Sequence, residues 1–508
     1  MMSGDPTVTA PVDRRPRLEA GLAASLPGLL ESFLSRQRWF AGKARTIERA
    51  ALEDVAWLPG AGEPRALALI GVHYADRAQE RYTLPLALAD DPGARSGIGR
   101  LDPAAGGAWV VDGTGDIATL HALLAGFARA QDLPARAGAR LRYGDLGLAS
   151  GPLFDPAALD PDAIRPMGAE QSNSSVRIGR SHVFKRFRRL PPGENPELEI
   201  GRFLTAGGRF WGSPALRGSL TYVDAAGAAT TLGVLQDLVA SRGDRWATTV
   251  GALRGILGAA GAPEPLVRDM LVLGGLTGEF HMALASDPHD PDFAPAPIEA
   301  ADVARWREQY DTLLHRVLDT LDRRAAGLPE QTRADAEAVV RARALLARPP
   351  RLPEPGEAVG FDRIRVHGDF HLGQTLRTED GHVLMDFEGE PARPLAERRA
   401  RQCALKDVAG MARSFDYAIE AARAAVGAAA AAGAPPLREA FLEGYLAHTL
   451  ERGAGFLPRD RQALDAWTDF FELDKALYEV EYELHNRPDW VGIPLRGVRR
   501  ILDRARDR

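Results

Sequence analysis

Two short segments in the last third of the chain most restrict its fold. Residues 365–374 read Arg-Val-His-Gly-Asp-Phe-His-Leu-Gly-Gln, and residues 382–388 read His-Val-Leu-Met-Asp-Phe-Glu. Each segment contains a β-prone apolar run that is followed by a carboxylate, Asp369 in the first and Asp386 in the second. Because short apolar runs of this kind form buried strands, two such strands would direct both carboxylates into one cleft.

The spacing of these acids has a chemical meaning. Gln374 follows Asp369 by 5 residues, and Asp386 follows it by 17. A kinase catalytic loop reads Asp-x-x-x-x-Asn, with a metal-binding aspartate on the next hairpin, and the side-chain carbonyl of Gln can replace that of Asn. One acid would then accept a proton while two oxygens hold a metal ion. The alternative is that these acids and glycines only form turns.

Two histidines flank the first acid. His367 and His371 lie four residues apart, as in a zinc-binding helix, but Gly368 occupies the position of the required glutamate. We therefore expect both histidines to shape the loop by hydrogen bonds.

Composition limits the class of protein. A chain of 508 residues predicts two or three structural units, and 45% hydrophobic and 26% charged residues are typical of a soluble globular protein. A net charge of −6 argues against a general nucleic-acid partner. Cys403 is the single cysteine, so no intrachain disulfide forms, and the apolar run at 427–433 is too short to span a membrane. These features predict a cytoplasmic enzyme without nucleic-acid or membrane partners.

The order of predicted elements gives an α+β, bilobal protein-kinase-like fold, with a small α+β unit before a small β-rich N-lobe and a mainly helical C-lobe. The predicted parts are a flexible tail (1–16), the small α+β unit (17–105), an intermediate nucleotide-binding N-lobe (106–240), and a helical C-lobe with the catalytic loop (241–508). In the C-lobe, Gly274-Gly-Leu-Thr-Gly278 has no preceding strand and no lysine, which predicts helix packing rather than a nucleotide loop. Predicted C-lobe helices include 395–432, 436–452 and 459–486.

The N-lobe has a candidate phosphate-binding lysine. Lys185 alternates with apolar residues in a predicted strand, and a basic residue there is unusual unless it meets an anion. An upstream turn rich in Ser and Asn can present N–H groups and hydroxyls to phosphate oxygens. Its candidate residues are Ser172, Asn173, Ser174 and Ser175. Lys185 is expected to pair with Glu199, with Glu197 as the alternative. The strand at 231–237 leads to a hinge whose backbone would bind adenine at Gln236, Asp237, Leu238 and Val239.

With these motifs in hand, the sequence resembles the bacterial maltokinases. The matching stretches are RWFAGKAR (38–45), EQSNSSV (170–176), HGDFHLGQ (367–374), DFEGEPARPLAERR (386–399), DVAGMARSFDY (407–417) and the region 478–495 with NRPDWVGIPL. HGDxH is shared with aminoglycoside and choline kinases, whereas DFEGEP with DVAG and SFDY is specific to the maltokinases.

The resemblance implies a kinase-like fold with ATP and Mg²⁺ as cofactors. It also implies that the unit at 17–105 is an N-terminal cap subdomain and that the C-lobe (241–508) contains the sugar pocket. It implies Asp369 as catalytic base, Gln374 and Asp386 as Mg²⁺ ligands, and Lys185 on the nucleotide phosphates. The implied reaction is phosphorylation of maltose at its anomeric hydroxyl to give maltose 1-phosphate, feeding α-glucan and glycogen synthesis, in functional association with trehalose synthase. One departure is Cys403-Ala-Leu-Lys406 in place of Ser-Pro-Leu-Arg, which predicts a less rigid loop.

Sugar pockets combine an aromatic face with forked polar groups. Besides Asp369, the candidate sugar-binding residues on that chemistry are Glu388, Lys475, Tyr478, Arg487 and Trp490. Arg487 and Trp490 could equally form a helix-end staple. Two other functions stay open, which are a kinase for glucosamine or another aminosugar or aminoglycoside, and a catalytically inactive kinase-like binding protein.

Overall fold

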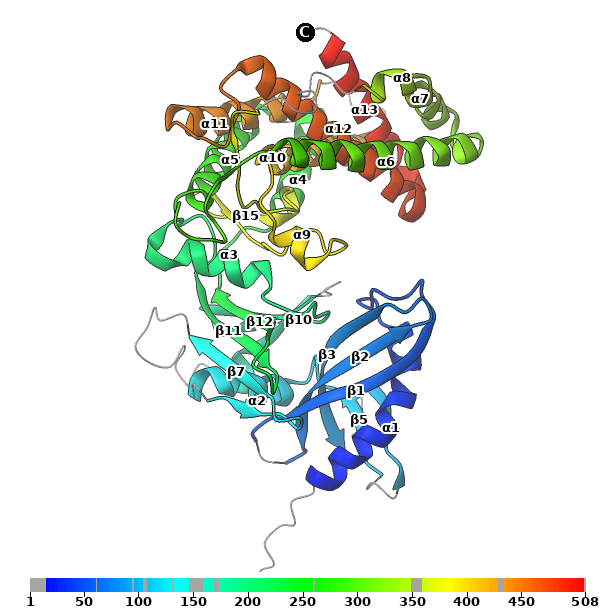
Figure 1. Ribbon diagram of the computed structural model, residues 1–508, viewed down its shortest axis with the longest axis vertical. Helices are drawn as coiled ribbons and strands as arrows, with labels where there is room; N and C mark the ends of the chain where they lie inside the picture. The colour runs from blue at the N-terminus through cyan, green and yellow to red at the C-terminus, as the bar shows by residue number, and fades with distance from the viewer. Residues whose placement is uncertain are drawn as a thin grey trace, which may run out of the picture. The chain divides into compact units, whose positions relative to one another are not determined.

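The computed structural model of the protein describes residues 15–60, 62–93, 96–103, 107–129, 131–145, 159–168, 173–258, 261–348, 359–427 and 433–506 (Figure 1). The chain divides into two compact units. The first contains residues 1–202 and 215–238, and the second contains residues 203–214 and 239–508. Among the described helices, none combines the length and apolar character needed to cross a membrane.

The N-terminal part of the first unit is an antiparallel five-stranded sheet covered by a helix. Its strands, in the order β1-β2-β3-β5-β4, are β1 (Ile47–Trp57), β2 (Arg65–Tyr74), β3 (Gln79–Ala89), β4 (Gly97–Arg100) and β5 (Trp109–Asp112). Helix α1 (Arg15–Ser35) has Leu22, Leu26 and Leu30 four residues apart, and all three are fully buried. This helical spacing gives α1 the apolar face that closes the core over the sheet.

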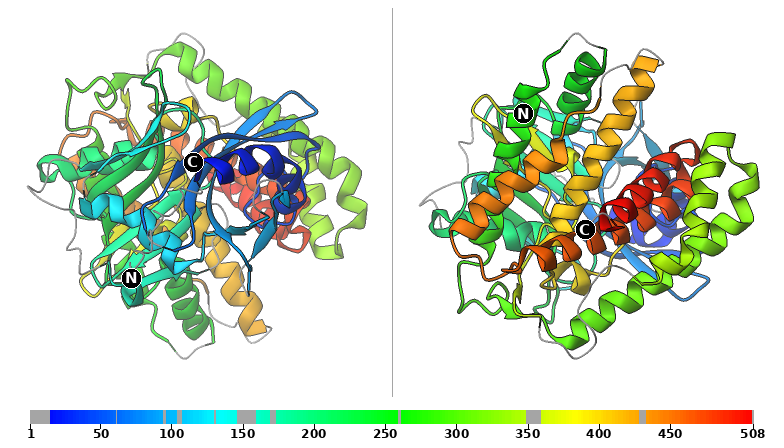
Figure 2. Two further views of the ribbon diagram at one scale, coloured as in Figure 1. Left: turned by 90° about the horizontal axis from the view of Figure 1, so that it is seen from below. Right: turned by 90° about the horizontal axis from the view of Figure 1, so that it is seen from above.

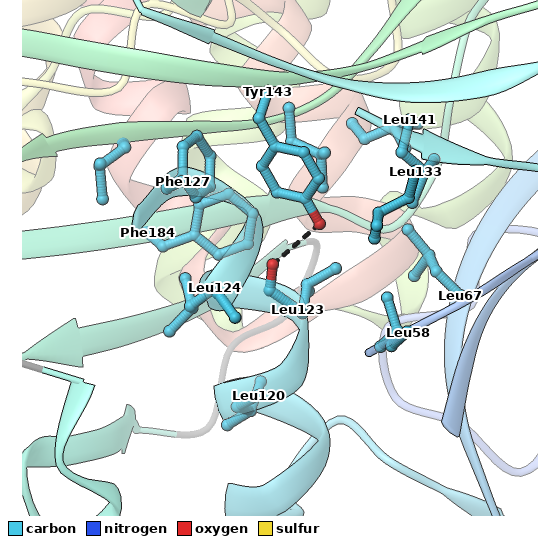
Figure 3. Close-up of a cluster of buried hydrophobic side chains, with 14 of the residues drawn as sticks. Leu58, Leu67, Leu120, Leu123, Leu124, Phe127, Leu133, Leu141, Tyr143 and Phe184 are labelled. Atoms are coloured by element: carbon cyan, nitrogen blue, oxygen red, sulfur yellow. Dashed lines mark hydrogen bonds between the residues drawn. The ribbon is translucent and has the colours of Figure 1, made fainter. Parts of the chain in front are cut away.

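A seven-stranded antiparallel sheet forms the rest of the first unit. Its order is β6-β7-β11-β12-β10-β9-β8, with β6 (Leu133–Pro134), β7 (Arg140–Asp145), β8 (Ile164–Met167), β9 (Asn173–Ile178), β10 (His182–Phe187), β11 (Leu216–Val223) and β12 (Ala229–Asp237). Helix α2 (Ile117–Arg129) packs Leu123 and Phe127 into a buried cluster with Tyr143 and Phe184 (Figure 3). The Tyr143 hydroxyl donates to the Leu123 carbonyl at 2.8 Å, which satisfies the phenol inside an apolar core.

The second unit is mainly helical (Figure 2). Its helices are α4 (Arg245–Leu257), α5 (Glu264–Leu284), α6 (Ala300–Arg324), α7 (Glu330–Arg341), α8 (Arg343–Leu346), α9 (Leu395–Arg399), α10 (Leu405–Val426), α11 (Leu437–Glu451), α12 (Arg461–Asn486) and α13 (Gly492–Arg506). Small antiparallel pairs join β13 (Ala296–Pro297) to β14 (Asp362–Arg363), and β15 (Thr375–Arg377) to β16 (His382–Leu384). The first motif leads into this hairpin, and the second motif contains β16. The strand predicted before Asp369 was wrong, because the apolar run there makes only an isolated bridge from Ile364 to Gln402.

Glycines allow α5 and α11 to pack backbone against backbone. A Cβ atom at Gly274 would lie 2.0 Å from the Phe441 carbonyl oxygen, and one at Gly444 would lie 1.9 Å from that of Leu271. Because neither position tolerates a side chain, the glycines set the distance between the helices. The prediction that Gly274 to Gly278 serves helix packing is confirmed.

The predicted sequence of elements, strands first and helices afterwards, is confirmed, but two C-terminal details were wrong. The predicted helix 395–432 is interrupted, because residues between α9 and α10 are extended and Gln402 exchanges backbone hydrogen bonds with Ile364 at 2.7 and 2.9 Å. Helix α13 was not predicted at all. The predicted tail lies outside the described residues up to residue 14, and the division into parts at 17, 106 and 241 stays a prediction.

Candidate active site

The β15–β16 hairpin brings Gln374 and Asp386 together. Thr375 pairs with Leu384, and the Met385 amide donates to the Gln374 carbonyl at 3.0 Å, so the two candidate metal ligands lie at the same end of the hairpin. Asp386 has φ +69°, in the left-handed region that non-glycine residues rarely adopt. Since such backbone strain persists where the surroundings fix it, Asp386 is held in a set orientation.

A buried carboxylate outside the predicted set holds the catalytic-loop backbone. Asp407, near the start of α10, accepts hydrogen bonds from the His367 amide at 2.7 Å and the Gly368 amide at 2.9 Å. His281 Nε2 lies 3.1 Å from the same carboxylate, and its Nδ1 lies 3.0 Å from the Tyr445 hydroxyl. Burial alone would raise the pKa of Asp407, but the hydrogen bond and charge of His281, with those of the loop, hold that pKa below its ordinary value.

Both loop histidines make the structural hydrogen bonds that were predicted. His367 Nε2 lies 3.0 Å from the Met385 carbonyl, which ties the loop to the hairpin, and His371 Nδ1 accepts from the Gly373 amide at 3.0 Å. Burial lowers the pKa of His371, although the nearby charge of Asp369 opposes the shift. His371 is therefore a neutral acceptor that shapes the turn before Gln374.

Asp369 lies beside a lysine of helix α12. Its Oδ1 is 3.8 Å from Lys475 Nζ, and the same ammonium is 2.6 Å from Glu390 Oε1. Burial would lower the pKa of Lys475, but attraction to Glu390 and Asp369 outweighs burial and raises that pKa. Lys475 is therefore a permanent cation that orients the Asp369 carboxylate.

Two cavities of the second unit adjoin this loop. The catalytic-loop pocket has a volume of about 470 Å³ and is lined by Asp369, Glu390 and Lys475 together with several arginines. The aromatic pocket has a volume of about 440 Å³ and five aromatic side chains besides Phe370 in its lining, which are Trp246, Tyr417, Tyr478, Tyr482 and Trp490. Lys475 and Phe370 line both pockets, so the two cavities meet at the catalytic loop.

Four of the predicted sugar-binding residues gather in the aromatic pocket, namely Lys475, Tyr478, Arg487 and Trp490. The Trp490 ring stacks on Tyr417 with centroids 6.3 Å apart, and the Arg487 guanidinium lies 5.2 Å from the Trp490 ring centre. Arg487 also pairs with Glu483 at 2.6 Å across the last turn of α12. The helix-end staple is therefore present, and the same residues line a cavity. Glu388 does not line either pocket, whereas Glu390 lines the catalytic-loop pocket.

In the first unit, Lys185 pairs with Glu197, the alternative to the expected Glu199. Lys185 Nζ lies 3.4 Å from Glu197 Oε2, and Gln236 Nε2 donates to Glu197 Oε1 at 2.8 Å. Both acids lie in the first turn of α3 (Pro196–Thr205), and both are buried. The contact with Glu197 is the alternative pairing, and a role for Glu199 stays a prediction.

The described part of the Ser/Asn segment, residues 173–175, is a strand rather than a turn. Asn173, Ser174 and Ser175 belong to β9, where they pair with residues 187 to 185 of β10. The Ser174 hydroxyl accepts from buried Arg186 at 3.1 Å, so it supports the sheet. Ser172 lies outside the described residues. The expectation of a turn at 173–175 was wrong because strand pairing continues to Asn173.

The predicted hinge lies at the end of β12. The Asp237 amide donates to the Ala215 carbonyl at 2.9 Å, and the Leu238 amide donates to the Ser181 carbonyl at 2.7 Å. The Asp237 carboxylate is paired with Arg217. Since both amides are already used, Asp237 and Leu238 can offer a nucleotide only their carbonyl oxygens.

The segment that departs from the maltokinase pattern makes defined contacts. Cys403, Ala404 and Leu405 are buried. Lys406 Nζ donates to Gln402 at 3.0 Å and lies 5.6 Å from the ring centres of Trp306 and Phe471. The lysine thus lies on an aromatic surface at the edge of the catalytic-loop pocket.

The chain has curated relatives that are glucosamine kinases. The Mycolicibacterium smegmatis glucosamine kinase is 28% identical over 345 residues, which cover 67% of this chain and 79% of that protein. The Streptacidiphilus jiangxiensis glucosamine kinase is 32% identical over 254 residues, 49% of this chain, so the match spans 53% of that relative's length. A solved glucosamine kinase in complex with glucosamine, ADP and inorganic phosphate aligns with a TM-score of 0.58 and 25% identity, over 95% of this chain and 98% of that one.

The cap gives the most specific match. Residues 33–116, which include the five-stranded sheet, match the maltokinase N-terminal cap domain. The chain is a relative of the maltokinases and glucosamine kinases. The resemblance to maltokinases that its motifs indicate is thereby confirmed. The predicted kinase-like fold, with a β-rich N-terminal part, a cap and a helical C-terminal part, is confirmed by the same comparisons.

Sequence reasoning missed Asp407, Glu390 and three aromatic residues of the aromatic pocket. Asp407 stands alone among apolar and small residues in Asp-Val-Ala-Gly-Met-Ala, a pattern that indicates a buried acid with a dedicated partner. Tyr417 ends the SFDY motif, which marks it without showing its place in a pocket, whereas Trp246 and Tyr482 lie outside the motifs that end at residues 374, 399 and 417 and come from helices far apart in the sequence.

Proposed function

We propose that the protein is an ATP-dependent, Mg²⁺-dependent sugar kinase that phosphorylates maltose at its anomeric hydroxyl to give maltose 1-phosphate. The kinase activity is supported by one observation above the others. A hairpin brings Gln374 beside Asp386, and buried Asp407 fixes the adjoining loop that carries Asp369. This arrangement supplies a proton acceptor and two metal-binding oxygens on a rigid backbone.

Each polar residue has one task in this proposal. Asp369 accepts the proton of the sugar hydroxyl, and Lys475 holds its carboxylate in place from 3.8 Å. Lys185, supported by Glu197, binds nucleotide phosphates, and the carbonyl groups at the end of β12 bind adenine. Asn173 and Ser175 remain candidates for phosphate contacts from β9.

Gln374 and Asp386 fit Mg²⁺. Mg²⁺ usually takes one or two protein oxygens and completes its shell with water and phosphate oxygens. In the described part of the chain no three His, Cys, Asp or Glu side chains form a metal cage, and a two-ligand site does not need one. The ion supplies charge neutralisation to the phosphates when bound.

The charge pairing of the acceptor region favours a neutral sugar. Three carboxylates that line the two pockets are each paired with a cation of the chain. Glu390 lies 2.6 Å from Lys475, Glu479 lies 2.8 Å from Arg413, and Glu483 lies 2.6 Å from Arg487. Because an ammonium group binds best to a carboxylate that lacks another partner, this pairing favours maltose over an aminosugar. The aromatic pocket next to the loop can take the second glucose ring by stacking.

A glucosamine kinase is the second candidate, because the curated relatives carry that activity. An inactive binding protein is disfavoured, because Lys185, Asp369, Gln374 and Asp386 are all present. The resemblance also implies a cytoplasmic location, a role in glycogen biosynthesis and functional association with trehalose synthase, and we include these in the proposal.

An acceptor panel tests the proposal. ATP consumption is measured with maltose, glucose, glucosamine and an aminoglycoside, and phosphorus NMR locates the new phosphate. We expect maltose to be preferred, with smaller sugars weakened by about 1–3 kcal/mol for each buried group left unpaired. Asp369→Asn should lower turnover by about 10²-fold or more while nucleotide still binds. Preference for glucosamine would replace maltose with the second candidate, and no transfer to any acceptor would favour a binding protein.

A further inference from the structure

An arginine cluster lies apart from the residues assigned above. A cavity of about 280 Å³ in the second unit is lined by Arg242, Arg245 and Arg377, with Asp269 as the single acid in its lining. Arg245 opens α4, Asp269 belongs to α5, and Arg377 ends β15. Arg242 also lies 3.7 Å from exposed Glu379, so the excess of positive charge on the cavity wall comes from Arg245 and Arg377, which share Asp269.

Arg245 is a buried cation with few good partners. Its side chain is 2% exposed. Both of its terminal nitrogens reach the same Asp269 oxygen, Oδ2, at 3.4 Å, which is long for a charge-assisted hydrogen bond. Its Nε is buried and has no hydrogen-bond partner. A buried guanidinium in this state is costly, and an anion that binds it would recover the lost interactions.

Arg377 competes for the same acceptor. Its guanidinium also contacts Asp269 Oδ2, so one carboxylate oxygen serves two cations. Burial, followed by repulsion from Arg377, lowers the pKa of Arg245 to about 10, and Arg245 is still a cation at neutral pH. Asp269 therefore neutralises one of the two guanidiniums and leaves the other for a second anion.

We infer that this cluster is a binding site for a small phosphate dianion. Arginine forks match phosphate oxygens geometrically, and two of them from different elements can hold one tetrahedral anion. Arg242, which is 66% exposed and 3.7 Å from exposed Glu379, also lines the cavity and can complete the binding set by leaving that solvent-screened pair. The anion comes either as free inorganic phosphate or as the phosphate group of a sugar phosphate.

Backbone hydrogen bonds connect the arginine cluster to the β15–β16 hairpin. Two backbone hydrogen bonds join Arg377 to the segment before α4, from the Arg242 amide to the Arg377 carbonyl at 2.7 Å and from the Arg377 amide to the Gly243 carbonyl at 2.9 Å. Arg377 is three residues after Gln374. An anion held by Arg245 and Arg377 would therefore bind the start of α4 to β15 and stabilise the hairpin.

Thermal unfolding of the full-length protein tests the site, with phosphate replacing chloride at constant ionic strength. We expect phosphate to raise the unfolding temperature of the unchanged protein. In Arg245→Met the half-saturating phosphate concentration should rise about tenfold or more, because a charge-assisted hydrogen-bonding group is lost. Arg377→Gln provides a second test if Arg245→Met does not fold. Arg254→Met, an exposed arginine of the same helix, is the matched control and should respond like the unchanged protein.

Two further measurements distinguish phosphate binding at the arginine cluster from phosphate binding at the proposed nucleotide site. Lys185→Met should retain the phosphate response if the anion binds at the arginine cluster. Glucose 1-phosphate in place of phosphate shows whether the cavity accepts an esterified phosphate as well as the free anion. A phosphate shift that survives in both Arg245→Met and Arg377→Gln, that disappears in Lys185→Met, or that chloride reproduces would overturn the assignment.

Discussion

Replacing Asp407 with Asn tests whether the catalytic-loop backbone depends on one buried carboxylate. The carboxylate accepts from two loop amides, at 2.7 and 2.9 Å, and contacts His281. Asn keeps the shape but turns an NH₂ group toward one of these N–H donors. The loss of charge-assisted hydrogen bonding costs about 1.5–3 kcal/mol and a buried unpaired N–H costs about 1–3 kcal/mol, so we expect a loss of about 2–5 kcal/mol.

Amide hydrogen exchange of the peptide containing His367 and Gly368 measures this loss locally. Since 1.4 kcal/mol corresponds to a factor of ten, exchange should be about 30-fold faster or more in Asp407→Asn. The pKa of Asp407 is lowered in the folded state, so the stabilisation is present above the unfolded pKa, near 4, and is lost as the pH falls through the folded pKa. The difference between the two proteins should therefore shrink below about pH 4.

Asp319→Asn, at an exposed position of α6, is the control and should exchange like the unchanged protein. If Asp407→Asn leaves loop exchange and unfolding at the control level, the carboxylate does not organise the loop, and the reasoning from its hydrogen bonds fails.

Three further predictions concern the loop, the metal and the nucleotide. Gly368→Ala should destabilise the second unit by about 1–2 kcal/mol, because φ is +84° and a Cβ would lie 3.3 Å from the Gly389 Cα; an unchanged denaturation midpoint would contradict this. Asp386→Ala should weaken metal-dependent nucleotide binding more than metal-free binding, and titrations with and without Mg²⁺ decide the point. Lys185→Met should weaken ATP binding by about tenfold or more, whereas equal calorimetric affinities would exclude a phosphate contact.

The elements closest to the motifs could be predicted from sequence because their information is local. The interval from Asp369 to Asp386 fits one loop and one hairpin, and the apolar run before Asp386 marks β16, whereas the run before Asp369 makes only an isolated bridge at Ile364. The Gly274 to Gly278 pattern likewise indicates a close helix contact without any knowledge of its partner. Residue roles that depend on a fixed spacing within a motif can therefore be predicted before the fold is known.

Local signals failed where a competing interaction decided the geometry. Glu197 and Glu199 are both acids in the first turn of α3, and the pairing of Lys185 with Glu197 cannot be inferred from that composition. The Ser/Asn segment has the composition of a turn, yet strand pairing with β10 extends to Asn173. The helix predicted across residues 400–404 is interrupted because Gln402 bonds to the backbone of Ile364, which no periodicity records.

The acceptor pocket shows why specificity is the hardest part to predict. Glu479 is paired with Arg413, 66 residues earlier in the chain, and Glu390 is paired with Lys475, 85 residues later. Taken alone, the acids of α12 indicate an anionic pocket that would suit an aminosugar. Their pairing leaves an aromatic cavity with compensated charge, which suits a neutral disaccharide. If the ammonium of glucosamine bound to Glu479 or Glu390, it would displace one of these internal cations, and replacing Arg413 or Lys475 by Met should then tighten glucosamine binding rather than weaken it.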